Sequence, residues 1–526
     1  MNNKNSEIIL CKNIKLDKNY NNVLNYTESR MVDLCRANQV ANSNNFSFIR
    51  KGENVIDTNF TYNQGLQANY IAFQNPSYSN KWFFAFVDEI EYISNGCARI
   101  YYTIDEHSTW FSLLTVKSCL VLREHVNSDE PGEHTVPEGL DTGEYVNVLK
   151  QENDYDNDFY ICFGVTKLLL AGKIGANSVY NGVFSGLLYI IAENNLSASL
   201  IIEQYSLKGM LENIVNVFYI PKKNVEITSG GWIALEDYPE YHWALIKSSN
   251  DPVNFGALQF NKPTKLDGNF VPKNKKLLAY PYCYALLDNN VGGTAILMYE
   301  YFFNPIEGLE NVCDVVIWGT IGAGCSIKAV PYYYKTIKIN YEEGLTLGKL
   351  PICSWSGDTY TNYLTQQSIN NAVKIGTIGA KIATEDYFGA FKESTNMISD
   401  LYQRSLAPYQ ISGNTNASDI MFSLKEIGLS IYHKSIKLEY AKIIDDYFTR
   451  FGYRINLIKI PNITGRPIYN YVQIGSNESI GYSENVNYSV TSKSLDIINQ
   501  IYRSGVTIWH NHANIGNFEL DNSLQN

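Results

Sequence analysis

The feature that most constrains the fold is an extended stretch interrupted by one turn, KWFFAFVDEIEYISNGCARIYYTIDEH, at residues 81–107. Asn95 and Gly96 accept the positive φ values of a tight hairpin, so the stretch predicts two antiparallel strands. After the turn, apolar side chains occupy every second position, at Ile100, Tyr102 and Ile104. A period of two places them on one face, which indicates a strand with one buried side.

Short segments of the same character recur between Gly, Pro and Asn breaks from about residue 156 to 350. They include FYICFGV, GLLYIIA, AILMYEYFF, DVVIWGTI and YYYKTIKINY. An aromatic content of 13%, most of it from 40 tyrosines, favours strands over helices. Many short strands between turns are typical of β-sandwiches and β-barrels. Because 526 residues exceed the size of one core, the sequence predicts a mainly β protein with several domains.

Charge and cysteine usage narrow the class of protein. A net charge of −11 makes the chain a poor candidate for holding DNA, since affinity for phosphates comes mainly from Lys and Arg. The nine cysteines are scattered and form no C-x-x-C, which predicts reduced, buried thiols. The first residues carry no signal-peptide pattern and no run of about 18 apolar residues occurs. We expect a chain that is made and folded in the cytosol.

One stretch departs from the β pattern, KIGTIGAKIATEDYFGAF at residues 374–391. Its small side chains and glycines suit neither a permanent membrane helix nor a stable core element. It also carries charges, among them Lys381, Glu385 and Asp386. The alternative is an amphipathic helical hairpin. The apolar residues that we single out as candidates are Ile375, Ile378, Ala380, Ile382, Tyr387, Phe388 and Phe391.

A helix is predicted over residues 418–452. Its apolar stripe continues at roughly helical spacing, through Ile420, Leu424, Ile427, Ile431, Leu438, Ala441, Phe448 and Phe451. Ser418 suits the N-cap, and Gly452 suits the position just past the end.

Three groups of residues could carry chemistry. His510 and His512 would share one face of a strand and could ligate a metal, but no third ligand is apparent nearby. His125 and His134 lie among carboxylates in a segment that also reads as a solvated acidic loop. Asp445 and Asp446 are adjacent, so on a helix they diverge by about 100° and cannot face one glycosidic bond. We therefore expect no catalytic residues, no metal site and no cofactor.

Dispersed motifs nevertheless point to a family. They are ARIYYTIDEHSTW, VLREHV followed by GEHTVPEGLDTGEYV, LEYAKIIDDYFTRFGYRINLIKIPNITGRPIYNYVQ, and IYRSGVTIWHNHANIGNFELDN. In this order, over about four-fifths of the chain, they resemble the tail knob (distal tail tube) proteins of phi29-like short-tailed bacteriophages, or podoviruses.

The resemblance implies a non-enzymatic structural protein of the virion. It implies a homohexameric tube at the distal end of the tail, made of β-barrel and β-sandwich domains. The tube contacts lower collar (portal nozzle) proteins, tail spikes or fibres and a tail-tip wall hydrolase. Phage DNA leaves through its lumen without specific binding. A Gly- and Ala-containing tip insertion, the slot of 374–391, plugs the lumen and transiently enters the host membrane.

On this basis the chain divides into six segments. These are an N-terminal β tube domain at 1–119, an extended linker at 120–155, middle β domains at 156–355, a small helical tip insertion at 356–417, the helix at 418–452, and a C-terminal β segment at 453–526 that returns to the tube domain. Two other functions stay open, a tail-associated cell-wall or glycan hydrolase and a host-receptor-binding module.

Overall fold

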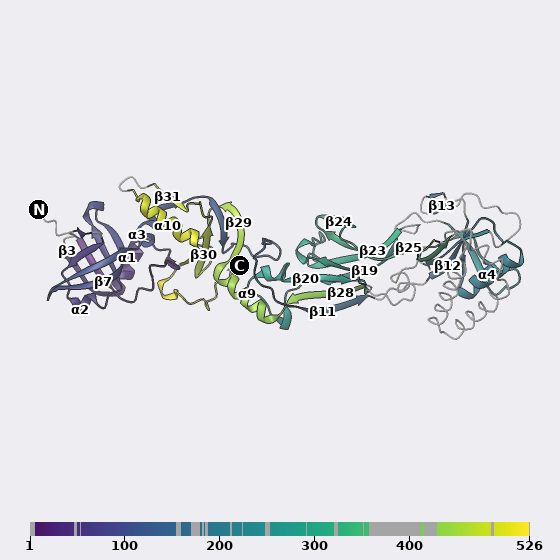
Figure 1. Ribbon diagram of the computed structural model, residues 1–526, viewed down its shortest axis with the longest axis horizontal. Coiled ribbons are helices and arrows are strands. Elements are labelled where there is room, and N and C mark those ends of the chain that lie inside the picture. Colours follow the sequence, from purple (N-terminus) through teal and green to yellow (C-terminus); the bar gives the residue numbers. More distant parts are fainter. Residues whose placement is uncertain are drawn as a thin grey trace. The chain divides into compact units, whose positions relative to one another are not determined.

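The fold is mainly β in a computed structural model (Figure 1). The structure describes residues 6–46, 50–52, 54–153, 159–169, 179–180, 183–184, 188–210, 213–222, 225–247, 253–290, 292–319, 325–350, 352–356, 412–414, 429–484 and 489–524. The chain forms two compact units. Unit 1 contains residues 1–144, 265–282 and 436–526, and unit 2 contains residues 145–264 and 283–435.

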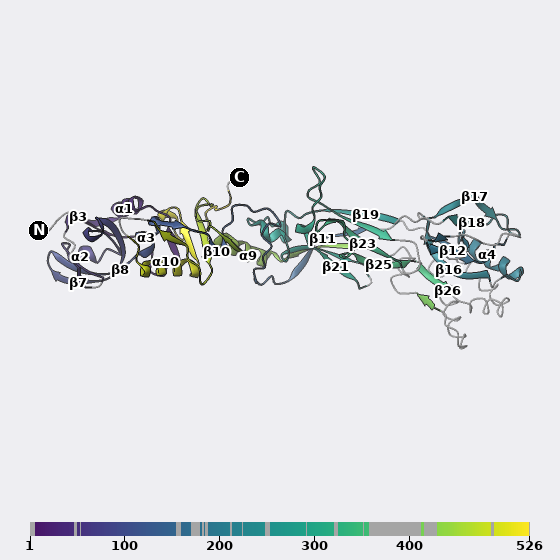
Figure 2. The ribbon, with the colours of Figure 1, turned by 90° about the horizontal axis from the view of Figure 1, so that it is seen from above.

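A curled seven-stranded sheet forms the N-terminal part of unit 1 (Figures 1 and 2). Its order is β3 (Gln39–Phe46), β1 (Ser6–Cys11), β6 (Tyr70–Asn75), β7 (Lys81–Ser94), β8 (Cys97–Ile104), β5 (Val55–Thr58) and β4 (Arg50–Gly52). The helices beside it are α1 (Glu28–Ala37), α2 (Tyr62–Gly65) and α3 (Glu106–Trp110).

A second sheet of unit 1 joins the two ends of the chain. Its order is β2 (Asn22–Leu24), β32 (Val506–Trp509), β30 (Tyr469–Ile474), β10 (Cys119–Glu124) and β29 (Tyr453–Lys459), and β2 pairs with β32 in parallel. A separate pair joins β9 (Leu114–Val116) to β31 (Gly481–Ser483). Two longer helices are α9 (Leu438–Phe451) and α10 (Ser492–Ser504). One core contains Ile9 and Phe84 from the first sheet with Tyr469 and Trp509 from the second.

Unit 2 contains three larger sheets. The first has the order β17 (Glu226–Ala234), β18 (His242–Lys247), β15 (Leu188–Ala192), β12 (Phe159–Val165), β16 (Ile214–Pro221), β26 (Ile352–Ser356) and β27 (Ser412–Asn414). The second has β11 (Tyr145–Asn153), β28 (Leu429–Ile436), β20 (Cys283–Asp288) and β21 (Thr294–Leu297). The third has β19 (Val253–Asn261), β22 (Val312–Gly319), β23 (Cys325–Tyr334) and β24 (Ile337–Ile339), with β25 (Leu345–Leu350) on β23. A short pair, β13 (Val179–Tyr180) and β14 (Val183–Phe184), and helix α4 (Asn195–Leu207) complete it.

The hairpin of residues 81–107 is confirmed, but its turn differs from the prediction. β7 and β8 pair on either side of Asn95 and Gly96, and Ile100 and Tyr102 are buried. Neither turn residue adopts a positive φ. A register shift between Tyr92 and Ser94 lies directly before the turn instead. Such a bulge increases the local twist, so the strands can close without a turn of the expected type.

The predicted helix is correct only in its second half. Helix α9 covers Leu438–Phe451, and Gly452 ends it with a φ of 64°. Residues Leu429–Ile436 instead form strand β28, which pairs with β20 from Cys283 to Asp288. A short apolar run fits a helical and a strand pattern equally well. Here the long-range hydrogen bonds to β20 decide in favour of the strand. Residues 415–428, including the predicted cap Ser418, lie outside the described residues.

Helices and strands also interrupt segments that were expected to be uniform. Helices α1 and α3 lie within the predicted N-terminal run of strands, and α10 lies within the predicted C-terminal β segment. The irregular linker is confined to residues 125–144, because β10 and β11 occupy its two ends. Among the described residues, no helix is both long and apolar enough to cross a bilayer. The division into six segments stays a prediction.

Candidate functional site: the strap of residues 125–144 and its anchors

Residues 125–144 leave the end of β10 and run through unit 1 without regular secondary structure. We call this segment the strap. It contains His125, His134 and the carboxylates that lie between and after them in the sequence. Backbone of this kind has few hydrogen bonds of its own, so its course depends on side-chain contacts. Those contacts decide whether the cluster is a reactive site or a structural anchor.

The first anchor lies where β10 ends. The carboxylate of Glu124 is fully buried, and it accepts hydrogen bonds from Lys459 Nζ at 2.5 Å and from the backbone N–H of Asn462 at 2.7 Å. The next residue, His125, accepts a hydrogen bond at Nδ1 from the N–H of Tyr471 at 2.8 Å. Its Nε2 therefore carries the proton and donates to the carbonyl of Thr449 at 3.0 Å.

Burial determines the protonation state of His125. Loss of hydration, with a smaller contribution from the positive charge of Arg466, lowers the pKa of His125 to about 3. The ring is thus neutral at physiological pH, and both of its nitrogens have partners. A histidine in this state positions backbone groups and is unavailable as a proton shuttle or as a metal ligand.

The second anchor is a buried cluster of charges around Glu138. This carboxylate, about 1% exposed, forms ion pairs with Arg123 and Lys276 and accepts a hydrogen bond from the N–H of Arg454 at 2.9 Å. Lys276 belongs to the short helix η6 (Lys275–Leu278). Its ammonium lies 5.3 Å from the centre of the Tyr453 ring, and burial lowers the pKa of Lys276. One carboxylate thus ties the strap to β10, η6 and β29.

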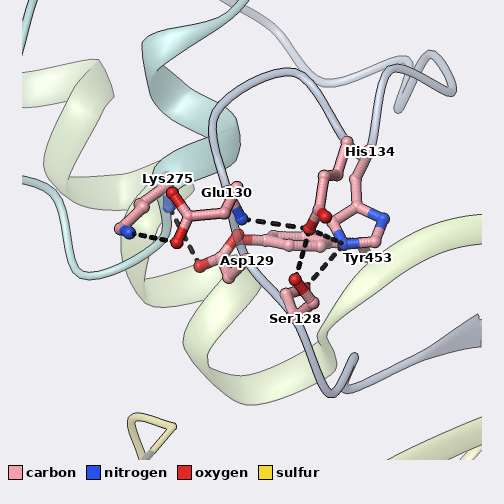
Figure 3. Close-up of polar contacts among 7 residues, drawn as sticks. Ser128, Asp129, Glu130, His134, Lys275 and Tyr453 are labelled. Atoms are coloured by element: carbon pink, nitrogen blue, oxygen red, sulfur yellow. Dashed lines mark hydrogen bonds and ion pairs between the residues drawn. The ribbon is translucent and has the colours of Figure 1, made fainter. Parts of the chain in front are cut away.

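The third anchor is the loop drawn in Figure 3, where short polar contacts fold residues 128–134 onto β29 and η6. The carboxylate of Asp129 accepts from the Tyr453 hydroxyl at 2.7 Å and from the N–H of Lys275 at 3.1 Å. The Lys275 ammonium reaches Glu130 at 3.0 Å. Nε2 of His134 lies 2.8 Å from the carbonyl of Ser128. Burial raises the pKa of Asp129 despite these hydrogen bonds.

The adjacent acids of α9 do not form a catalytic pair. Asp445 accepts hydrogen bonds from the N–H groups of Lys273 and Asn274, both at 3.0 Å, and from the Asn274 side chain at 2.8 Å. Asp446 is exposed and pairs with Arg450 at 3.0 Å. The two carboxylates point to different surroundings, as their helical spacing predicts, so they cannot act on one bond.

His510 and His512, near the C-terminus, form hydrogen bonds with different partners. Nε2 of His510 lies 3.0 Å from the side-chain oxygen of Asn470, and Nε2 of His512 accepts from the N–H of Lys15 at 3.0 Å. Within the part of the chain that the structure describes, no three His, Cys, Asp or Glu side chains gather as metal ligands.

The apolar candidates of residues 374–391 lie outside the described residues, so their role stays a prediction. The Glu138 cluster, in contrast, was missed by the sequence interpretation. No spacing rule connects Arg123 with Glu138, which lie 15 residues apart, and Lys276 lies 138 residues beyond Glu138. The arrangement in unit 1 is one of buried charges that hold segments together, a chemistry of structural anchoring.

Comparison with known proteins agrees with a structural role. Residues 251–523 match the family model of the C-terminal domain of the tail knob protein gp9 of Bacillus phage phi29. Residues 4–114 match the model of the N-terminus of caudoviral major tail proteins.

Individual relatives span nearly the whole chain. The chain is similar to the tail knob protein gp9 of Bacillus phage PZA, with 24% identity over 91% of each chain, and of Bacillus phage B103, with 25% identity over 92% of each. The corresponding protein of Bacillus phage phi29 is 24% identical over 91% of each chain. The solved structure of the tail knob protein gp12 of bacteriophage C1 covers 99% of this chain and 100% of its own, with a TM-score of 0.60 and 15% identity. This last likeness concerns the fold.

Proposed function

The chain belongs to the tail knob protein family of phi29-like phages, a structural component of the tail of a short-tailed phage, and we propose that six copies of it close into a hollow tube at the distal end of that tail. In this proposal the genome leaves through the tube. The observation that carries it is the family match over the C-terminal half together with relatives of the same name across nine-tenths of the chain.

An exposed sheet edge in unit 1 supports assembly into a ring. β29 is the last strand of its sheet and pairs only with β10 among the described residues. Large apolar side chains on and beyond it are exposed, at Leu457, Ile458 and Ile460. An open apolar edge invites pairing with another chain. In such an assembly, one face of each copy contacts a different face of the next copy. The assembly closes into a ring when the rotation between neighbouring copies divides a full turn.

The test of this proposal is the oligomeric state of the purified chain. Mass photometry and negative-stain electron microscopy are expected to give particles of six chains and end-on rings with a central opening. A chain that stays monomeric at micromolar and higher concentrations, without portal or collar proteins, contradicts self-assembly into a tube. The tail-knob family assignment would stand even then.

The tip insertion is part of the same proposal. We infer that the residues around 374–391 plug the lumen and then contact the host membrane. Small side chains and glycines give this segment a weak conformational preference, which permits two packings of similar free energy. The net charge of −11 supports passage of DNA without sticking, since an acidic wall repels the phosphates. Appreciable affinity of the assembled particle for DNA at low salt contradicts a repulsive lumen.

A further inference from the structure

A small cavity in unit 1 lies between the start of the strap, the end of α9 and the C-terminal segment. Its volume is about 20 Å³, and its lining consists of His125, Lys273, Asn274, Thr449, Arg466, Leu520, Asp521, Asn522 and Ser523. None of the activities discussed above uses it. A cavity of this size has room for roughly one water molecule or one ion of similar radius.

The guanidinium of Arg466 is a buried and incompletely bonded group in the wall. Arg466 is 8% exposed, and it donates from Nη1 to the carbonyl of Asn522 at a long 3.4 Å. Its Nε is buried and has no hydrogen-bond partner. A guanidinium offers five N–H donors, and the one at Nε is buried without an acceptor. Burial accordingly lowers the pKa of Arg466.

The other polar groups of the wall already have partners. Both nitrogens of His125 are engaged, as described above. The Asn274 amide donates to the Thr449 hydroxyl at 2.9 Å. The side-chain oxygen of Asn522 accepts hydrogen bonds from the N–H groups of Ile468 and Tyr469. The side-chain nitrogen of Asn522 donates to the carbonyl of Tyr469 at 2.9 Å. None of these groups accepts a hydrogen bond from Arg466 Nε.

The nearest carboxylates do not neutralise Arg466 directly. Asp129 attracts it electrostatically, but its two oxygens are bonded to Lys275 and Tyr453. Asp521 is exposed and binds the backbone and hydroxyl of Ser523. In the part of the chain that the structure describes, Arg466 has no direct ion pair, and its strongest attraction is the one to Asp129. A buried charge without a direct counter-ion is unfavourable, so Arg466 attracts an anion into the cavity, against the repulsion of the Asp521 carboxylate in the same wall.

We propose that this cavity is a binding site for a single monatomic anion, chloride under physiological conditions. The anion accepts the hydrogen bond of Arg466 Nε, and at the rim the exposed ammonium of Lys273 offsets the negative charge of Asp521. A bound ion adds a tie between Arg466 and the segment 520–523, which Asn522 fixes to β30. Chloride is then a structural ligand that stabilises the closure of the C-terminal segment.

The test compares halide with a large anion at constant ionic strength. Thermal unfolding of the full chain is followed in sodium chloride, in sodium bromide and in sodium gluconate. Above the dissociation constant, the unfolding temperature is expected to rise by on the order of 3 °C for each tenfold increase in chloride. Arg466→Gln is expected to abolish this rise, whereas the control Arg454→Gln, an exposed arginine of β29, keeps it.

Crystals of the unaltered chain grown in bromide give a test that does not depend on the variant folding. An anomalous peak beside Arg466 Nε is expected. A water molecule there, with no anomalous signal and equal unfolding temperatures in chloride and gluconate, overturns the proposal. If Arg466→Gln does not fold, Lys273→Gln serves in its place, and it is expected to shift the chloride dependence to higher concentration.

Discussion

The N–H of Tyr471 in β30 donates to Nδ1 of His125 at 2.8 Å, and this contact fixes His125 as a neutral ring whose other nitrogen bonds α9. One imidazole thus bridges the strap, the central strand of a sheet and the last turn of a helix. Protonation of Nδ1 would place a second N–H against that of Tyr471. Protonation of His125 would therefore break the contact between the strap and β30, so this contact depends on pH.

The first prediction concerns acid stability. Burial lowers the pKa of both His125 and His107 to about 3, while the unfolded chain titrates near 6.5. The unfolded state then binds more protons between pH 6.5 and 3, so stability falls as pH falls through this window. Each histidine contributes a loss of about 1.4 kcal/mol per pH unit there.

Urea unfolding at pH 7 and at pH 5 measures this effect. His125→Gln is expected to lose stability at pH 7 but to show a shallower decline toward pH 5 than the unaltered chain. Taking the difference between two proteins cancels the contributions of the buried Asp105 and Asp129. If the unfolding free energies of the two proteins depend on pH identically, folding does not lower the pKa of His125.

The second prediction concerns the Glu138 anchor. Glu138→Ala leaves the cations of Arg123 and Lys276 buried without their carboxylate, and it is expected to cost about 3–5 kcal/mol of unfolding free energy. The control is Glu130→Ala, which breaks the exposed pair with Lys275 and is expected to cost less than about 1 kcal/mol. Equal effects of the two substitutions would mean that the Glu138 cluster is not a special anchor.

The third prediction concerns the edge of β29. Ile458 is 78% exposed, so Ile458→Lys is expected to leave the subunit folded while placing a charge on the proposed contact edge. Mass photometry should show more single chains and fewer particles of six chains. The protein concentration needed for assembly is expected to rise at least tenfold. Ile443→Lys, on an exposed position of α9, is the control and should assemble normally. If Ile458→Lys forms rings as readily as the control, β29 is not the contact edge.

The fourth prediction concerns the tip insertion. Deletion of residues 374–391 is expected to abolish the release of dye from liposomes at mildly acidic pH without changing the oligomeric state. A milder variant, Phe388→Asp, should reduce leakage, because an apolar side chain entering lipid contributes roughly 1.5–3 kcal/mol. Leakage by the deletion variant at the rate of the intact chain would remove the membrane role and leave only the plug.

The sequence predicts local features better than long-range ones. Gly452 was correctly placed at the end of α9, because a positive φ at a helix end is a property of a few residues. A side chain there would also meet the carbonyl oxygen of Glu124 at 2.1 Å, a contact that the sequence cannot show. The strand at Leu429–Ile436 was misread as helix, because its partner β20 lies far away in the chain.

The same limit applies to the candidate site. Clustered acids and histidines drew attention to the strap, but their type alone does not distinguish a reactive group from a buried anchor. That distinction depends on partners such as Tyr471, Lys276 and Tyr453, which come from other segments. Burial of a charge becomes visible only when the fold brings its partners together.

The parallel pairing of β2 with β32 has a consequence for biosynthesis. Asn22–Leu24 are synthesised before unit 2, and their partner strand Val506–Trp509 is synthesised after it. Unit 1 therefore cannot be completed before all of unit 2 has been synthesised. The sheet that carries the β29 edge is thus completed later than unit 2, which delays the contact between copies that we propose for this edge.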